Sequence, residues 1–282
     1  MKSILVATDF SNDAYCALFY CAKLLKEEPC TFYILNVYDE MTPLENKRAP
    51  FLSNKNELKE IEDQSIERLE KFIHKITLDT ENTKHTYIAL SKEGNLTKNI
   101  ENTSKEYDID LVVMGSRGET GAKELFFGSN TVQIINAIKT CPVLVIPKQI
   151  DYKAPKEIAF VTDFKQGCSL NNIAPILLIA KQTNAAIRVM HIFEEANLDA
   201  EQKLKYKLLD NYLKDYPHSF ATMKDFNEKA QVINEFITER EIDLLCMVHQ
   251  KRSFLEKLMR EPVIKDVSMY ANIPFLILPN KE

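Results

Sequence analysis

Features that would mark several classes of protein are scarce or absent in this sequence of 282 residues. It has no basic excess, because 36 Lys and Arg residues stand against 41 Asp and Glu residues, for a formal net charge of −5. We therefore expect no nucleic-acid partner. No apolar run approaches the roughly 18 residues that a membrane helix needs, and the run at residues 4–7 is too short for a signal-peptide core. We expect a cytoplasmic protein with no membrane contact.

Cysteine and histidine are present, but without the spacing of a disulfide framework or a metal site. The six cysteines include no CxxC pair, so we expect free thiols packed as small hydrophobic residues, as in a reducing compartment. The five histidines show no HxH or HExxH spacing, so the sequence predicts no metal site.

The chain contains an internal repeat. Residues 4–10 read ILVATDF and residues 158–164 read IAFVTDF, while PVLVIP at 142–147 matches PFLILP at 274–279. Matches that recur in the same order indicate that the chain contains two copies of one domain. The length agrees, because it suits two domains or one large one. Apolar residues at 45% and charged residues at 27% are ordinary for globular proteins, which excludes a disordered or coiled-coil chain.

We predict a first domain at residues 1–148 and a degenerate second copy at 156–282, with a linker between the prolines at 147 and 155. Short apolar runs alternate in both copies with segments of helical period. That alternation predicts an α/β fold with parallel strands covered by helices on both faces. We expect strands at 4–7, 32–37, 86–90, 111–114, 143–146, 158–161, 187–192, 221–226, 244–248 and 275–278, and helices at 13–26, 58–76, 96–107, 131–139, 173–181, 200–214, 230–240 and 263–270.

The last strand of each copy, at 143–146 and 275–278, is apolar and expected at a sheet edge. Exposed apolar edges invite pairing, and two in one chain can satisfy each other. The sequence therefore predicts two similar open five-stranded sheets packed as an internal pseudo-dimer. Association of two chains into a homodimer stays open.

A candidate ligand site follows from the strand order, because open α/β sheets bind ligands beyond the carboxyl ends of their strands. Thr8 and Asp9 follow the first strand, and Val37 ends the second. Residues 115–131 follow the fourth and hold four of the chain's six glycines. Glycines let backbone amides approach a bulky anion, and a helix start favours phosphate. The alternative is a loop that only makes turns and a helix cap. No Walker lysine motif and no GxGxxG are present.

The spacing Gly115-x2-Gly118-x9-Gly128-Ser129 resembles the signature of the ATP-binding branch of the universal stress protein family. VVMGSRG before it, TCPVLVIP after it and the opening ILVATDFS are similar to that family as well. The resemblance covers all of the first copy and, more weakly, the second. It implies a stress-response sensor or regulator that binds ATP, AMP or ADP. Whether Mg²⁺ accompanies the phosphates is left open.

By the family pattern the site residues of the first copy would divide between the parts of the nucleotide. Two of them also have plainer alternatives, because Asp9 could only cap a turn and Arg117 could be a solvated loop charge. Thr8 and Asp9 would face the adenosine, Val37 the adenine edge through its backbone, Met114 and Gly115 the ribose side, and Arg117, Gly118, Gly128, Ser129, Asn130 and Thr131 the phosphates.

The second copy departs from this pattern. It keeps Thr162 and Asp163, but residues 249–263 contain no glycine, and Glu261 and Pro262 stand where Gly128 and Ser129 should be. A carboxylate repels phosphate and proline lacks an N–H, so we predict one nucleotide per chain. Two alternative functions remain: an interaction module that binds no nucleotide, and a slow ATP hydrolase. No catalytic set of side chains stands out, so we expect a binding protein rather than an enzyme.

Overall fold

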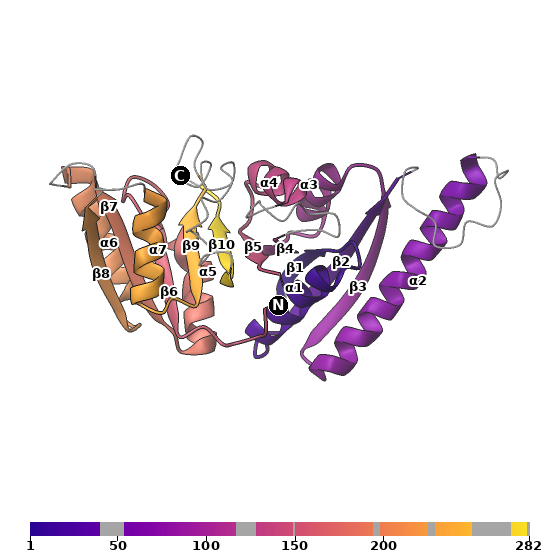
Figure 1. The fold of residues 1–282 in the computed structure, drawn as a ribbon, viewed down its shortest axis with the longest axis horizontal. Coiled ribbons are helices and arrows are strands. Elements are labelled where there is room, and N and C mark those ends of the chain that lie inside the picture. Colours follow the sequence, from indigo (N-terminus) through magenta and orange to yellow (C-terminus); the bar gives the residue numbers. More distant parts are fainter. Residues whose placement is uncertain are drawn as a thin grey trace.

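A single mixed sheet organises the chain in its computed structural model, which describes residues 1–39, 54–116, 128–148, 150–193, 198–224, 229–249 and 272–280. Within these residues ten strands follow the order β3-β2-β1-β4-β5-β10-β9-β6-β7-β8 (Figure 1). The first copy forms one half of this sheet and the second copy the other. The predicted α/β class and the alternation of strands and helices are confirmed.

The first copy (residues 1–148) and the second copy (156–282) repeat the same order of elements. The helix predicted at 263–270 lies outside the described residues. The first copy contains β1 (Lys2–Ala7), α1 (Asn12–Leu24), β2 (Cys30–Tyr38), α2 (Asn54–Thr80), β3 (His85–Glu93), α3 (Leu96–Glu106), β4 (Leu111–Gly115), α4 (Ser129–Ala137) and β5 (Val143–Ile146). The second contains β6 (Glu157–Thr162), α5 (Leu170–Thr183), β7 (Ala186–Phe193), α6 (Ala200–Leu213), β8 (His218–Lys224), α7 (Lys229–Glu239), β9 (Leu244–Val248) and β10 (Phe275–Leu278).

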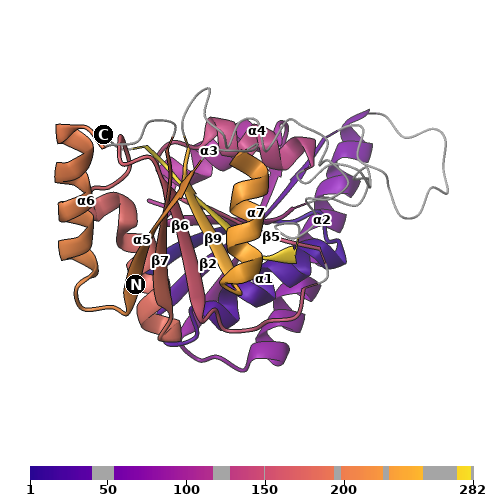
Figure 2. The same ribbon diagram turned by 60° about the vertical axis from the view of Figure 1, so that its left-hand side comes forward.

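The helices cover both faces of the sheet, because alternate residues of the buried strands point to opposite sides. In β1, Ile4 and Val6 belong to the core that packs under α1, α2, α5 and α6, whereas Leu5 and Ala7 belong to the core under α3, α4 and α7. Figure 2 shows α7 in front of β9, with α6 at the outer side. Each of the two cores runs through both copies.

The two copies join through an antiparallel pairing of β5 with β10, in which Leu144 lies opposite Leu276. All other pairings in the sheet are parallel. The predicted internal pseudo-dimer is confirmed. The two five-stranded sheets are continuous rather than separate, because each copy satisfies the open edge of the other.

Side chains reinforce this junction. The buried His249, just after β9, contacts Asn136 and Lys139 near the end of α4, with ring nitrogens 3.1 Å from Asn136 Oδ1 and 3.0 Å from Lys139 Nζ. The Tyr20 hydroxyl of α1 donates to the Lys153 carbonyl of the linker. Polar groups from both copies therefore fix how the two halves meet.

Ser11 is the N-cap of α1, and its hydroxyl accepts from the Ala14 N–H. All six cysteines are free thiols. Among the helices that the structure describes, none combines the length and apolar content needed to cross a lipid bilayer.

One aspartate holds the start of the second copy in place. Asp243, just before β9, accepts hydrogen bonds from the backbone N–H groups of Lys156 and Glu157 and from Lys153 Nζ, at 2.8 to 3.1 Å. Partial burial works against its charged form, but these bonds hold the pKa of Asp243 below its usual value. Asp110 makes the corresponding bonds to Lys2 and Ser3 in the first copy.

We predict that Asp243→Ala lowers the free energy of unfolding by about 1–3 kcal/mol at pH 7, because two N–H groups lose a charged acceptor. The folded pKa is the lower one, so the contribution is full above the unfolded value of about 3.9 and declines as pH falls through the folded pKa. Urea unfolding at several pH values should show wild type and variant converging below about pH 4. The exposed Asp215→Ala is the control, and a gap independent of pH would contradict the prediction.

Candidate functional site

The candidate site lies at the switch point of the first copy's sheet. The chain builds β2 and β3 on one side of β1, and β4 and β5 on the other. Val6 of β1 is paired with Val113 of β4, so the segments after Ala7 and Met114 leave the sheet at the same edge. Connections that diverge in this way open a crevice outside the carboxyl ends of two neighbouring strands. Thr8, Asp9 and Gly115 therefore lie at the same edge of the sheet.

The segment after β1 forms a tight turn built by its own polar side chains. The Thr8 hydroxyl accepts from the Phe10 N–H at 2.9 Å, and Asp9 Oδ1 accepts from the Ser11 N–H at 3.0 Å. Phe10 takes the left-handed conformation, with φ 65°. Thr8 is buried and Asp9 is exposed. Asp9 therefore caps the turn, which was the plainer alternative for this residue. Asp9 is also exposed at the carboxyl edge of the sheet.

A buried hydrogen-bond network that the sequence analysis missed supports this turn. Asn36 of β2 donates from Nδ2 to the Thr8 carbonyl at 2.8 Å, and its Oδ1 accepts from the Ser65 hydroxyl at 2.8 Å. Ser65 Oγ also lies 2.7 Å from Ser91 Oγ of β3. The available signal was the single amide side chain in a mostly apolar β2.

The start of α4 is fastened to the end of β4. The Gly128 N–H donates to the Ser116 carbonyl at 2.8 Å, and the Thr131 hydroxyl lies 3.2 Å from the Gly115 carbonyl and 3.3 Å from that of Ser116. Thr131 is 2% exposed. The Thr131 hydroxyl and the Gly128 amide thus hold the turn in this structure, and their predicted role toward phosphate stays a prediction.

The exposed residues at the start of α4 are Ser129 and Asn130. Both are in the first turn of α4, where backbone N–H groups have no acceptor within the helix, and the helix dipole adds positive potential. Gly128 has φ −64° and ψ 157°, an extended conformation open to any residue. A substitution at Gly128 therefore introduces no backbone strain.

The remaining predicted site residues differ in how far their side chains are buried near the carboxyl edge of the sheet. Val37 is half-buried near the end of β2, and Met114 is buried in the core under α3 and α4, so both would meet a ligand mainly through their backbones. Burial raises the pKa of the neighbouring Tyr38 phenol, with Glu62 and Glu93 adding to the effect, so it stays protonated. Arg117 and Gly118 lie outside the described residues.

The switch point of the second copy, between β6 and β9, is built differently. Phe10 precedes the N-cap Ser11 directly, whereas four extra residues, 165–168, separate Phe164 from the N-cap Ser169. Within them Gly167 has φ +73° and lies so close to the Val248 side chain that a Cβ on Gly167 would clash with it. Val248 ends β9 at the position that Gly115 has in β4. The extra turn and the valine thus fill the space over the strand ends. Glu261 and Pro262 lie outside the described residues.

Comparison with known proteins identifies the class. The model of the universal stress protein family matches twice, at residues 1–147 and 156–279. The chain therefore belongs to the universal stress protein family. It is 29% identical over 153 residues to the universal stress protein YxiE of Bacillus subtilis (strain 168), which covers 51% of this chain and 98% of that relative. That relative matches one half of the chain.

Solved structures show the same fold over the whole length. A universal stress protein from Archaeoglobus fulgidus DSM 4304 matches with a TM-score of 0.71 at 14% identity, over 99% of this chain and 96% of that one. A putative universal stress protein from Pseudomonas aeruginosa UCBPP-PA14 matches with a TM-score of 0.56 at 12% identity, over 99% and 93%. These likenesses support the tandem architecture.

We predict that Gly128→Val weakens binding of adenine nucleotide by at least about 10-fold, or about 1.4 kcal/mol, because a branched side chain would stand beside the amides of Ser129 and Asn130. The backbone at Gly128 suits valine, so the variant should fold. Calorimetric titration measures the affinity. Gln133→Val, at an exposed position of α4, should bind as wild type. Wild-type affinity in folded Gly128→Val would rule out this turn as the phosphate site.

Proposed function

We propose that the first copy binds ATP or a related adenine nucleotide and that the protein acts as a stress-response sensor or regulator. The observation that carries the proposal is the attachment of the α4 start to the end of β4, beside the turn after β1. Amides at a helix start and a switch-point crevice together make a phosphate-binding site of a familiar kind. Membership of the universal stress protein family and the glycine spacing support the same ligand.

The residues divide between two roles. Ser129 and Asn130, two exposed residues in the first turn of α4, would donate backbone N–H groups to phosphate oxygens, while the exposed Asp9 would accept from sugar hydroxyls. Asn36 is a positioning residue, because it fixes the Thr8 carbonyl and so the turn that carries Asp9. In the described part of the chain no group of three or more His, Cys, Asp and Glu side chains is placed to hold a metal ion. Mg²⁺ would therefore depend on the phosphates for most of its ligands.

The test is the content of the purified protein. Protein released from its ligands by denaturation should yield an adenine nucleotide, close to one per chain, in liquid chromatography with mass spectrometry. A nucleotide-free protein that also fails to bind added ATP would favour the interaction module instead. Phosphate release above a blank, lost in Gly128→Val, would favour the slow hydrolase.

We also propose that only the first copy binds nucleotide. The support is the contrast between the two switch points: Gly115 in one, and Val248 against Gly167 in the other. A nucleotide at the second site would have to displace the extra turn at 165–168. That turn is held in part by the contact of Cys168 Sγ with Thr162 Oγ1, 3.6 Å apart. The second copy then serves as the structural partner whose β10 pairs with β5 of the first copy.

Asp9 and Asp163 form a matched pair for this proposal, because each accepts one hydrogen bond from a backbone N–H two residues on. Loss of that hydrogen bond should lower the free energy of unfolding by a similar amount in the two variants Asp9→Ala and Asp163→Ala. We predict that Asp9→Ala weakens ATP binding by the worth of about one hydrogen bond, ~1 kcal/mol, whereas Asp163→Ala leaves affinity unchanged. Calorimetric titration should give a stoichiometry near one. A value of two, or equal losses in the two variants, would contradict the asymmetry.

A further inference from the structure

The turn that follows β1 is held by the helix α2. The Ser65 hydroxyl of α2 donates to Asn36 Oδ1 at 2.8 Å, and Asn36 Nδ2 donates to the Thr8 carbonyl at 2.8 Å. All three residues are buried. The other buried side chains described in α2 are apolar: Ile61, Leu69, Phe72 and Ile76. The one buried hydroxyl of this helix therefore connects it, through two hydrogen bonds, to the backbone of the turn that carries Asp9.

The hydrogens of this connection follow from its fixed end. A carbonyl only accepts, so Asn36 turns its Nδ2 to Thr8 and its Oδ1 to Ser65. Ser65 has a single hydrogen and gives it to Asn36. In the 2.7 Å contact between the hydroxyls of Ser65 and Ser91 the donor is therefore Ser91 of β3. Each donor has its acceptor, so the network favours one arrangement of α2, β2, β3 and the turn.

A second contact between α2 and the turn lies one helical turn further along. The Arg68 guanidinium lies over the Phe10 ring, 4.3 Å from its centre, and Phe72 meets the same ring edge-on at 6.0 Å. Phe10 directly follows Asp9 and has the left-handed φ of 65°, which is uncommon for a bulky residue. The helix therefore contacts the turn in two ways, at the backbone of Thr8 and at the side chain of Phe10.

The second copy secures the corresponding turn with different residues. His191 of β7 takes the place of Asn36, and its Nδ1 lies 3.0 Å from the Thr162 carbonyl. Gln202 of α6 donates directly to the Asp163 carbonyl at 2.8 Å. A helix contacts the turn in both copies, but only the first copy uses a connection through an amide of the neighbouring strand among the described residues. The bond from Gln202 therefore provides a matched control for the bond from α2.

We propose that ATP binding is coupled to the docking of α2, an inference that rests on the proposed nucleotide site of the first copy. Ser65 and Arg68 are then positioning residues, because they act on the turn through Asn36 and Phe10. The two states are a docked α2 and a locally opened one. A nucleotide that contacts the turn favours the docked state, and by linkage a docked α2 raises the affinity for nucleotide. Because α2 lies along the outer side of the first copy (Figure 1), occupancy of the site reaches the surface of the molecule.

The competing explanation is that Ser65 only stabilises the fold, in which case its loss leaves the ATP affinity of the folded protein unchanged. Calorimetric titration of ATP separates the two explanations. Ser65→Ala should weaken binding by about 5-fold, the equivalent of about one hydrogen bond, and Arg68→Ala by about 2–5-fold for the lost contact with the Phe10 ring. Alanine favours helix, so both variants should fold. Gln202→Ala, which removes the bond between helix and turn in the second copy, should bind as wild type does.

Hydrogen exchange of backbone amides in the intact chain tests the coupling itself. Saturating ATP should slow exchange at residues 61–76 of α2 in wild type and leave α6 unchanged. In Ser65→Ala, brought to the same occupancy by ATP, the slowing in α2 should fall by at least half. A purely structural role of Ser65 does not produce that loss.

The outcomes separate the coupling from the proposed function. ATP binding with no response of α2, an equal response of α6, or wild-type affinity in folded Ser65→Ala and Arg68→Ala would overturn the coupling alone. A wild-type chain that binds no ATP would overturn the proposed function and the coupling together.

Discussion

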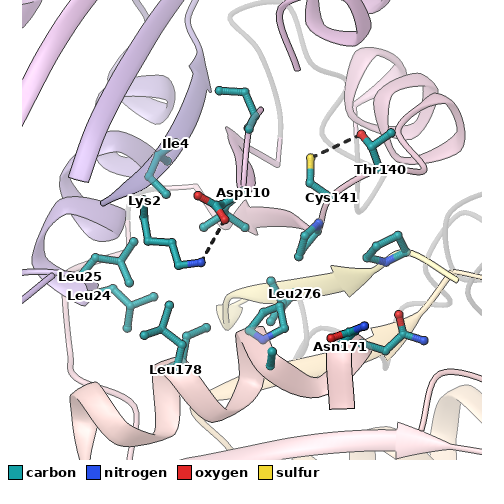
Figure 3. Close-up of a pocket in the computed structure, with 18 residues that line it drawn as sticks. Lys2, Ile4, Leu24, Leu25, Asp110, Thr140, Cys141, Asn171, Leu178 and Leu276 are labelled. Carbon is teal, nitrogen blue, oxygen red and sulfur yellow. Dashed lines mark hydrogen bonds and ion pairs between the residues drawn. The ribbon is translucent and has the colours of Figure 1, made fainter. Parts of the chain in front are cut away.

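The pairing of β5 with β10 is the contact on which the rest of this molecule depends. A five-stranded parallel sheet with an apolar last strand leaves an edge of unpaired backbone groups, and the repeat supplies a similar edge in the same chain. Because the two strands are antiparallel and their residues alternate between the two faces, one short pairing joins both hydrophobic cores at once. Leu144 and Leu276 lie in the core under α1 and α5, while Val143 and Ile277 lie in the core under α4 and α7. The same junction borders a pocket lined by residues of α1, α5 and β10 (Figure 3).

The repeat allows the two copies to diverge, since only one of them needs to keep an open switch point. The first copy retains glycine at the end of β4 and a direct step from Phe10 to Ser11. The second has a valine and four extra residues at these places, and their packing supports the account of a scaffold copy. These differences agree with the proposal that the first copy binds the nucleotide and the second copy acts as its structural partner.

The fold could be predicted almost entirely from the sequence, because its signals are local and repeated. Short apolar runs such as 143–146 agree with the strands found, and the polar ends of β3 and α2 were missed because solvated residues carry no apolar period. In the site, the strand ends predicted the meeting of Thr8, Asp9 and Gly115. The roles of Gly128 and Thr131 could not be predicted, since they depend on contacts with Gly115 and Ser116 that are formed only in three dimensions. The close packing of Gly167 against Val248 likewise joins residues 81 positions apart.

The most direct test of the central claim, one nucleotide held at the first switch point, is to locate bound ATP by methyl NMR on the intact chain. Ala7 and Met114 lie at the carboxyl ends of β1 and β4, and Val161 and Val248 lie at the carboxyl ends of β6 and β9. We predict saturable shifts at Ala7 and Met114 as ATP is added, with Val161 and Val248 unchanged at the same occupancy. Shifts at Val248 that saturate alongside those at Met114, or shifts at neither switch point, would contradict the account.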